Sequence, residues 1–303
     1  MTDTIEPNPA MIGGVPQAPL VFLPKPARLF IDRAKRLEFL AKDHPAAAFL
    51  IFVAALSRVQ ARLVDDLPAP NPIPADRADL ARASRMPPID RPALAGDATL
   101  NATLDAILTG CADLDMPEAS RLALSAVTAA GEDDRKWLLG NALAGTIPED
   151  SIAPHLFAVA AVQVHLARLA GSLDGAKLVP ISTGVCPACG GRPATSLVTG
   201  APGIENVRYA SCAHCATQWN EVRVKCLCCG STKGISYRAA GDENAVIKAE
   251  CCSECNGWLK ILYQSRNPTL DPVADDLGSL GLDMMMKDSP FQRAGANPFL
   301  AGL

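Results

Sequence analysis

The chain has 303 residues, of which 49% are hydrophobic, 20% charged and only 5% aromatic, and its formal net charge is −4. This length allows a buried core and favours two domains, and the composition argues for a globular protein against a disordered or fibrous one. The small net charge provides no general attraction to nucleic acid or to an anionic membrane.

The N-terminal segment lacks the features of a secretory signal. Its first thirty residues have no basic start, and Pro24 interrupts their longest apolar piece. The most apolar run of the chain, residues 46–56, is far shorter than the roughly 20 residues that span a bilayer. We therefore expect a buried helix there, no membrane insertion and a cytoplasmic location. Cysteines in that reducing compartment bind metal or do redox chemistry more often than they form disulfides.

The first 180 residues carry the pattern of an all-α domain. Proline-rich stretches at residues 66–77 and 85–97 predict long connections between its helices. Besides the apolar run at residues 46–56, four segments place apolar side chains at three- and four-residue intervals: residues 29–43, 117–130, 133–145 and 151–171.

Residues 181–266 predict a small β domain, and residues 267–303 a C-terminal helix and tail. The helix has Asp271 as its expected N-cap and Pro272 at its first position. The predicted fold class is therefore α+β. The β domain contains six short β-prone runs between turn residues: residues 193–198, 207–211, 218–224, 234–238, 245–250 and 258–263.

The cysteines concentrate in the predicted β domain. Only Cys111 precedes it, and the other ten lie within it. The first two CxxC pairs recur forty residues later as the last two, which indicates an internal duplication. The same shift places Cys228 opposite Ala188 and Cys251 opposite Ser211, so we expect neither thiol to be a ligand. Eight cysteines form the four pairs: Cys186/Cys189, Cys212/Cys215, Cys226/Cys229 and Cys252/Cys255.

Each copy of the duplication offers four thiolates, which suits one tetrahedral metal ion. Two CxxC turns on neighbouring hairpins supply the ligands of zinc ribbons and rubredoxin-like folds, so we predict two metal ions per chain. Pairing within each copy is favoured over a crossed arrangement, because such a unit could bind metal and fold before it was duplicated. Four thiolates accept iron or zinc, so the spacing leaves the metal open.

Other residues give weaker signals. His214 lies inside a CxxC pair and is expected to face solvent beside the metal, whereas His155 and His165 are expected to pack within a helix. A closed site of four thiolates is typical of a structural metal. Motifs for phosphate, dinucleotide or hydrolytic chemistry do not occur in the sequence, so we expect a protein that is not an enzyme.

The four CxxC pairs, with "LKILY", "VADDLGSLGLD" and "NPF" after them, resemble the FdhE family of formate dehydrogenase accessory proteins. The resemblance is strong over about residues 185–300 and extends weakly into residues 33–56. It implies a cytoplasmic maturation factor that binds the catalytic subunit of a respiratory formate dehydrogenase before export. It also implies that the eight paired cysteines hold iron in a tandem rubredoxin-like domain. The oligomeric state stays open, a homodimer included.

Two other functions stay open. A rubredoxin-like redox protein acting on the immature client would require iron. A nucleic-acid-binding zinc ribbon is less consistent with the sequence, because residues 180–265 have nearly balanced charges and no basic stripe around their tryptophans. We therefore expect no nucleic-acid partner.

Overall fold

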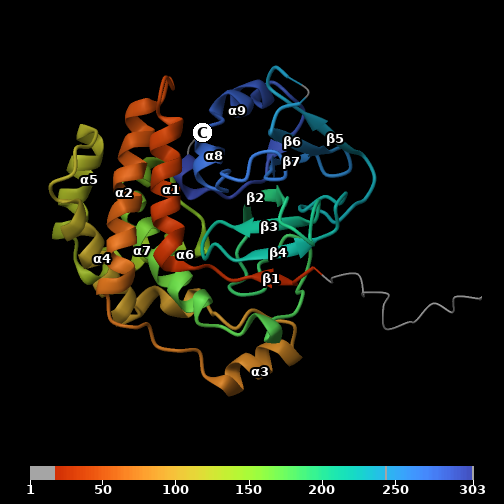
Figure 1. Ribbon diagram of the computed structural model, residues 1–303. Coiled ribbons are helices and arrows are strands. Elements are labelled where there is room, and N and C mark those ends of the chain that lie inside the picture. Colours follow the sequence, from red (N-terminus) through yellow and green to blue (C-terminus); the bar gives the residue numbers. More distant parts are fainter. Residues whose placement is uncertain (1–17, 243, 302–303) are drawn as a thin grey trace, which may run out of the picture.

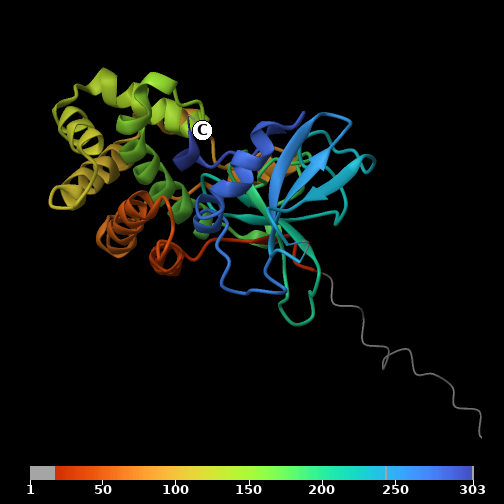
Figure 2. The same ribbon diagram turned by 90° about the horizontal axis from the view of Figure 1, so that it is seen from above.

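The computed structural model describes residues 18–242 and 244–301 (Figure 1). Of the N-terminal thirty residues considered above as a signal, residues 1–17 lie outside this part. Helices occupy the first half of the described chain and most strands the second, which confirms the α+β class. Figure 2 shows the helices and the sheet side by side, with the C-terminal helices at their junction. The domain boundaries after residues 180 and 266 stay predictions.

The helices expected from amphipathic spacing are all present. The apolar run at residues 46–56 forms the first half of the second helix. The helices of this half are α1 (Pro26–Leu40), α2 (Ala47–Asp66), α3 (Ala75–Ala83), α4 (Ala98–Cys111), α5 (Glu118–Ala129), α6 (Glu132–Ala144) and α7 (Ile152–Gly171).

Helices α3 and α4 are findings of the structure that the sequence analysis did not predict. α4 begins where the side chain of Asp97 accepts hydrogen bonds from the backbone N–H groups of Thr99 and Leu100, at 2.8 and 2.9 Å. Asp is a favoured N-cap, so this start could have been recognised. α3 is short and mostly exposed, and its position in a proline-rich connection concealed it.

Helix α7 is the centre of the helical half. Its side chains are buried almost without a break from His155 to Ala170, because α2, α4, α5 and α6 all pack on it. His155 and His165 are both buried, as expected. By length and composition alone α2 and α7 could span a membrane, but 50% and 78% of their apolar windows are buried inside the fold. That burial is typical of core helices.

One sheet contains both copies of the duplication, in the order β1-β4-β3-β2-β7-β6-β5 with β8 beside β7. The copies join where β2 lies parallel to β7, pairing Ser196 with Ile261 and Val198 with Tyr263. All six predicted strands are present, whereas β1 and β8 were not predicted. The bounds are β1 (Val21–Phe22), β2 (Pro193–Val198), β3 (Arg208–Cys212), β4 (Gln218–Glu221), β5 (Ile235–Arg238), β6 (Ile247–Cys252), β7 (Gly257–Tyr263) and β8 (Gln292–Arg293).

The C-terminal segment forms two short helices, α8 (Ala274–Leu277) and α9 (Leu280–Lys287), in place of the single helix expected from Asp271 onward. Asp271 does cap the first of them, since its Oδ1 accepts the backbone N–H groups of Val273 and Ala274. The break falls at Gly278 and Ser279, where the Ser279 hydroxyl donates to the Asp275 carbonyl at 2.6 Å.

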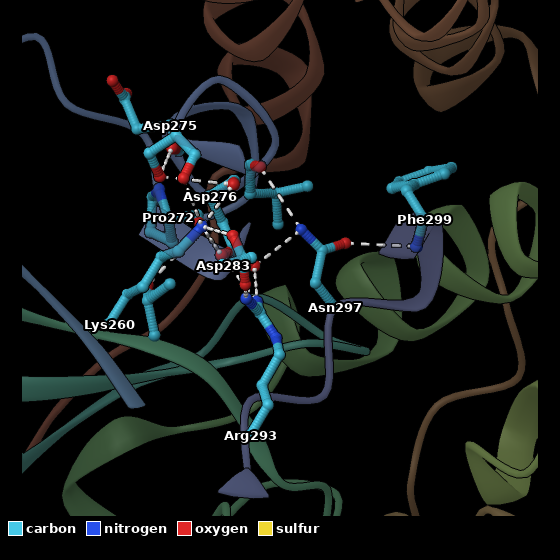
Figure 3. Close-up of polar contacts among 11 residues, drawn as sticks. Lys260, Pro272, Asp275, Asp276, Asp283, Arg293, Asn297 and Phe299 are labelled. Atoms are coloured by element: carbon cyan, nitrogen blue, oxygen red, sulfur yellow. Dashed lines mark hydrogen bonds and ion pairs between the residues drawn. The ribbon is translucent and has the colours of Figure 1, made fainter. Parts of the chain in front are cut away.

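A buried ionic network holds this segment on the sheet (Figure 3). Lys260 of β7 places its Nζ 3.0 Å from Asp276 and 2.5 Å from Asp283. Arg293 of β8 donates to both carboxylate oxygens of Asp276, at 2.6 and 2.7 Å, and to Asp283. The side-chain amide of Asn297 donates to Asp276 at 3.0 Å. Every carboxylate is therefore paired, as buried charges require.

Candidate metal centres

The first four-cysteine cluster lies at the ends of strands in copy 1. Cys186 and Cys189 come from the turn before β2, Cys212 ends β3, and Cys215 comes from the turn before β4. The Sγ atoms of Cys186 and Cys215 are 3.6 Å apart, those of Cys189 and Cys212 are 3.5 Å apart, and all four lie within 4.8 Å of one another.

The second cluster repeats this arrangement in copy 2. The Sγ atoms of Cys226 and Cys255 are 3.7 Å apart and those of Cys229 and Cys252 are 3.8 Å apart. Both clusters are thus formed within a copy, and the crossed arrangement is not the one the structure adopts. A tetrahedral ion with metal–sulfur bonds of about 2.3 Å has sulfur–sulfur edges of about 3.8 Å, so both clusters fit such an ion.

Each CxxC turn closes through a residue in the left-handed region. Gly190 and Gly230 have φ of 70° and 80°, and Ala216 and Asn256 have φ of 58° and 54°. In the first turn of each copy that glycine donates its N–H to the carbonyl of the first cysteine, Gly190 to Cys186 and Gly230 to Cys226. Glycine reaches this conformation without the steric cost that other residues meet.

The helical half covers the first cluster. Arg91 donates to the carbonyl of Cys189 at 2.8 Å, and the N–H of Ile89 donates to the carbonyl of Ala188 at 3.1 Å. From α7, Gln163 donates to the carbonyl of Ala213 at 3.2 Å. All four sulfurs of the first cluster are consequently buried, whereas Cys229 and Cys255 of the second are exposed. The duplicated sequence therefore gives two clusters of unequal access to solvent.

His214 does not face solvent, so that expectation was wrong. Its side chain is 7% exposed, because the end of α6 at Gly145 packs against the imidazole. Its Nδ1 has no hydrogen-bond partner within the described residues. This nitrogen and the Sγ of Cys212 both lie close to Gly191. A metal-bound thiolate at Cys212 would offer this nitrogen an acceptor, so the surroundings of the cluster also fit a bound ion.

The remaining cysteines lie outside both clusters. Cys251 is buried against Trp258, and Cys111 is buried at the end of α4. Cys228 is exposed, and its Sγ and that of Cys255 both lie close to Gly257. Burial raises the pKa of Cys111 to about 12 and that of Cys251 to about 11. Both are thus protonated thiols at neutral pH and poor nucleophiles.

The chemistry available to the clusters follows from their ligand set. Burial raises the pKa of the Cys186 thiol, so its thiolate needs a cation beside it. Four thiolates around one ion leave no open coordination position for a substrate. Such a centre can hold the two turns of a copy together or pass electrons without binding a substrate.

A helical half joined to a sheet that carries two four-cysteine clusters defines a zinc-ribbon or rubredoxin type of protein with a duplicated centre. Three family models match the chain: the FdhE N-terminal model over residues 18–183, the central domain over 185–223 and the C-terminal domain over 224–300. The chain therefore belongs to the FdhE family, as its cysteine pattern indicated.

Relatives cover nearly the whole chain. The "Protein FdhE homolog" of Rhizobium meliloti (strain 1021) is 54% identical over 300 residues, covering 98% of each chain. The homolog from Pseudomonas aeruginosa is 35% identical, covering 92% of each. The crystal structure of the FdhE protein from Pseudomonas aeruginosa superposes with a TM-score of 0.84 at 33% identity, covering 93% of this chain and 99% of that one.

Proposed function

We propose that this protein is a cytoplasmic accessory factor that binds the catalytic subunit of a respiratory formate dehydrogenase before its export. Membership of the FdhE family supports an accessory protein for formate dehydrogenase. The observation that carries the proposal is the similarity over 98% of the chain, which includes both four-cysteine clusters and the C-terminal segment. The protein acts here by binding, not as an enzyme.

The eight paired cysteines hold two metal ions in this proposal, iron in the cell with zinc as the alternative. The ions would serve the client-binding surface by holding the turns of each copy in place. The sulfur–sulfur distances of 3.5–3.8 Å support one ion in each cluster.

Capture of the client tests the proposal. The metal-loaded full chain serves as bait in an extract of cells that express a respiratory formate dehydrogenase, and bound proteins are identified by mass spectrometry. We expect the catalytic subunit to be retained. A Cys186→Ser/Cys212→Ser variant, which loses two ligands of the buried cluster, is the control and should retain less. Failure of the wild-type protein to retain an expressed catalytic subunit contradicts the proposal.

The exposure of the second cluster favours one alternative. With Cys229 and Cys255 at the surface, iron in copy 2 could exchange electrons with an immature client without contact to the buried core. This redox function requires protein that contains iron as isolated and changes colour reversibly on reduction. Zinc in both clusters would eliminate it.

A further inference from the structure

A groove with mixed polar and apolar lining runs beside α1, between that helix and the sheet. Two cavities of about 850 and 270 Å³ make up this groove, since Leu29, Asp32, Ala216 and Gln218 line both. The larger cavity extends to the loop at residues 264–272, which precedes α8. Residues of α1, β3 and β4 line the larger cavity, and Figure 1 shows α1 facing these two strands.

Arg33, which lines this groove, has hydrogen-bonding capacity that the described residues leave unused. Its side chain is 3% exposed, and its Nε has no hydrogen-bond partner. The Oδ1 of Asp271 is 3.5 Å away, but this oxygen already accepts the N–H groups of Val273 and Ala274 at 2.9 and 2.7 Å. The Nη1 atom makes one long hydrogen bond of 3.4 Å to Gln163. A buried guanidinium normally binds a carboxylate through short, paired hydrogen bonds, which Arg33 lacks.

The neighbouring Arg36 shows the contrast. It donates to both carboxylate oxygens of Asp275, at 2.6–3.1 Å, and to the Thr269 hydroxyl at 3.1 Å. These bonds fasten α1 to the C-terminal segment, so the donors of Arg36 are largely used by the fold. Arg33, one turn earlier on the same helix, is the buried cation with donors left for a ligand.

The charge of the groove is locally positive, although the whole chain carries −4. Among the described residues that line it, the anionic side chains are Asp271 and Asp32, which lies 3.8 Å from Arg28. Three of its cations, Lys25, Arg28 and Lys35, are exposed at the rim. An anionic partner complements this distribution. The cationic lining residues are Lys25, Arg28, Arg33, Lys35 and Arg36.

Uncharged polar side chains decide what kind of anion fits. Gln218, Gln264 and Asn267 line the groove with amide groups that can donate and accept. The fold uses part of this capacity, since Gln264 donates to the Leu270 carbonyl and the Asn267 oxygen accepts from Thr269. A peptide backbone presents the complementary alternation of N–H and C=O groups. We propose that the groove binds an acidic peptide segment of a client protein, with one carboxylate on Arg33 and the adjoining backbone on these amide side chains. The inference deepens the proposed client binding and rests on it.

Binding of a labelled peptide tests the groove. Fluorescein-labelled hexaglutamate is titrated with the metal-loaded full chain, and fluorescence anisotropy is recorded with hexaglutamine as the neutral comparison. We expect hexaglutamate to bind, more weakly as salt rises, and hexaglutamine not to bind. Arg33→Gln should weaken binding about tenfold or more, since it removes the buried cation.

A second variant separates binding from folding. Arg28→Glu/Lys35→Glu reverses two exposed rim charges, so its thermal unfolding should match wild type while hexaglutamate binding is lost. The matched control, Arg82→Glu/Lys136→Glu, makes the same charge change at exposed helix positions outside the groove and should bind as wild type does.

Several outcomes would contradict the proposal that this groove binds an acidic peptide. One is hexaglutamate binding no better than hexaglutamine. Another is equal binding by wild type and the Arg28→Glu/Lys35→Glu variant. A third is displacement of the peptide by a single-stranded oligonucleotide of equal charge that binds more tightly, because the groove would then recognise phosphates. If the Arg28→Glu/Lys35→Glu variant captures the catalytic subunit at the wild-type level, the peptide-binding role of the groove is contradicted and the proposed function stands. If the wild-type protein captures no catalytic subunit, the proposed function is contradicted even where hexaglutamate binds.

Discussion

Three cysteines within four residues of copy 2 differ in what they contact. The sulfurs of Cys226 and Cys229 belong to the second cluster, whereas Cys228 lies outside it. Replacing either ligand by Ser leaves three thiolates, so we expect Cys226→Ser and Cys229→Ser to lower the metal content from two ions per chain to one. Cys228→Ser should retain both ions and remove one accessible thiol. Elemental analysis and thiol titration measure these quantities, and metal loss in Cys228→Ser equal to that in Cys226→Ser would contradict the assignment.

Lys260 provides a prediction about pH. Burial lowers its pKa to about 8, against the opposing effect of Asp276. An unfolded lysine titrates near 10.4, so the unfolded chain binds more protons between these values and this residue's contribution to stability grows as pH rises. We expect the unfolding free energy of wild type, relative to Lys260→Met, to increase by about 3 kcal/mol from pH 7.5 to 10.5. Urea unfolding of both proteins at each pH measures this difference in unfolding free energy. A relative stability that falls over this range would show that the carboxylates outweigh burial.

At the scale of elements, the two copies differ in how the rest of the fold covers them. The helical half covers the four cysteines of copy 1, whereas two of the four clustered cysteines of copy 2 are exposed. We expect a chelator to remove about half of the metal in a fast phase and the rest much more slowly, because the buried ion is released only when the helices open locally. Cys229→Ser should lose the fast phase. Release in a single phase from wild type would show that the helical cover does not protect copy 1.

For the whole molecule, the ionic network around Asp276 joins the sheet to the C-terminal segment. Asp275 and Asp276 are both buried in ion pairs, with Arg36 and with Lys260 and Arg293 respectively. Asp276→Ala leaves the buried Lys260 without one of its carboxylates, and we expect it to cost about 3–5 kcal/mol of unfolding free energy.

The exposed pair of Arg58 and Glu38 provides the comparison for that loss. Arg58→Ala should cost below about 1 kcal/mol, since solvent screens a surface pair. Chemical denaturation of both variants checks the difference. Equal losses would mean that the buried network adds nothing beyond an ordinary surface ion pair.

The sequence by itself determined the helical half, the six main strands and the two sets of four cysteines. These features depend on near neighbours in the chain: apolar spacing along one helix, alternation along one strand, and two thiols on one turn. The forty-residue repeat added the register, which separates Cys228 from Cys226 and Cys229. Periodicity did not mark α3, β1 or β8, because they are short or mostly exposed, and for α4 the capping signal at Asp97 was present but not used.

Only the tertiary structure decided how these parts meet. Residues far apart in the chain meet in the parallel pairing of β2 with β7 and in the burial of copy 1 against Arg91 and Gln163. The same holds for Arg33, whose guanidinium lies beside Asp271 with unused donors. Two copies that repeat the same cysteine spacing carry no local signal of which one the helices will cover. The helical cover also buries His214, which was expected to face solvent. Which copy the helices cover depends on packing between distant surfaces, because apolar area must be buried and polar groups must find partners at the same time.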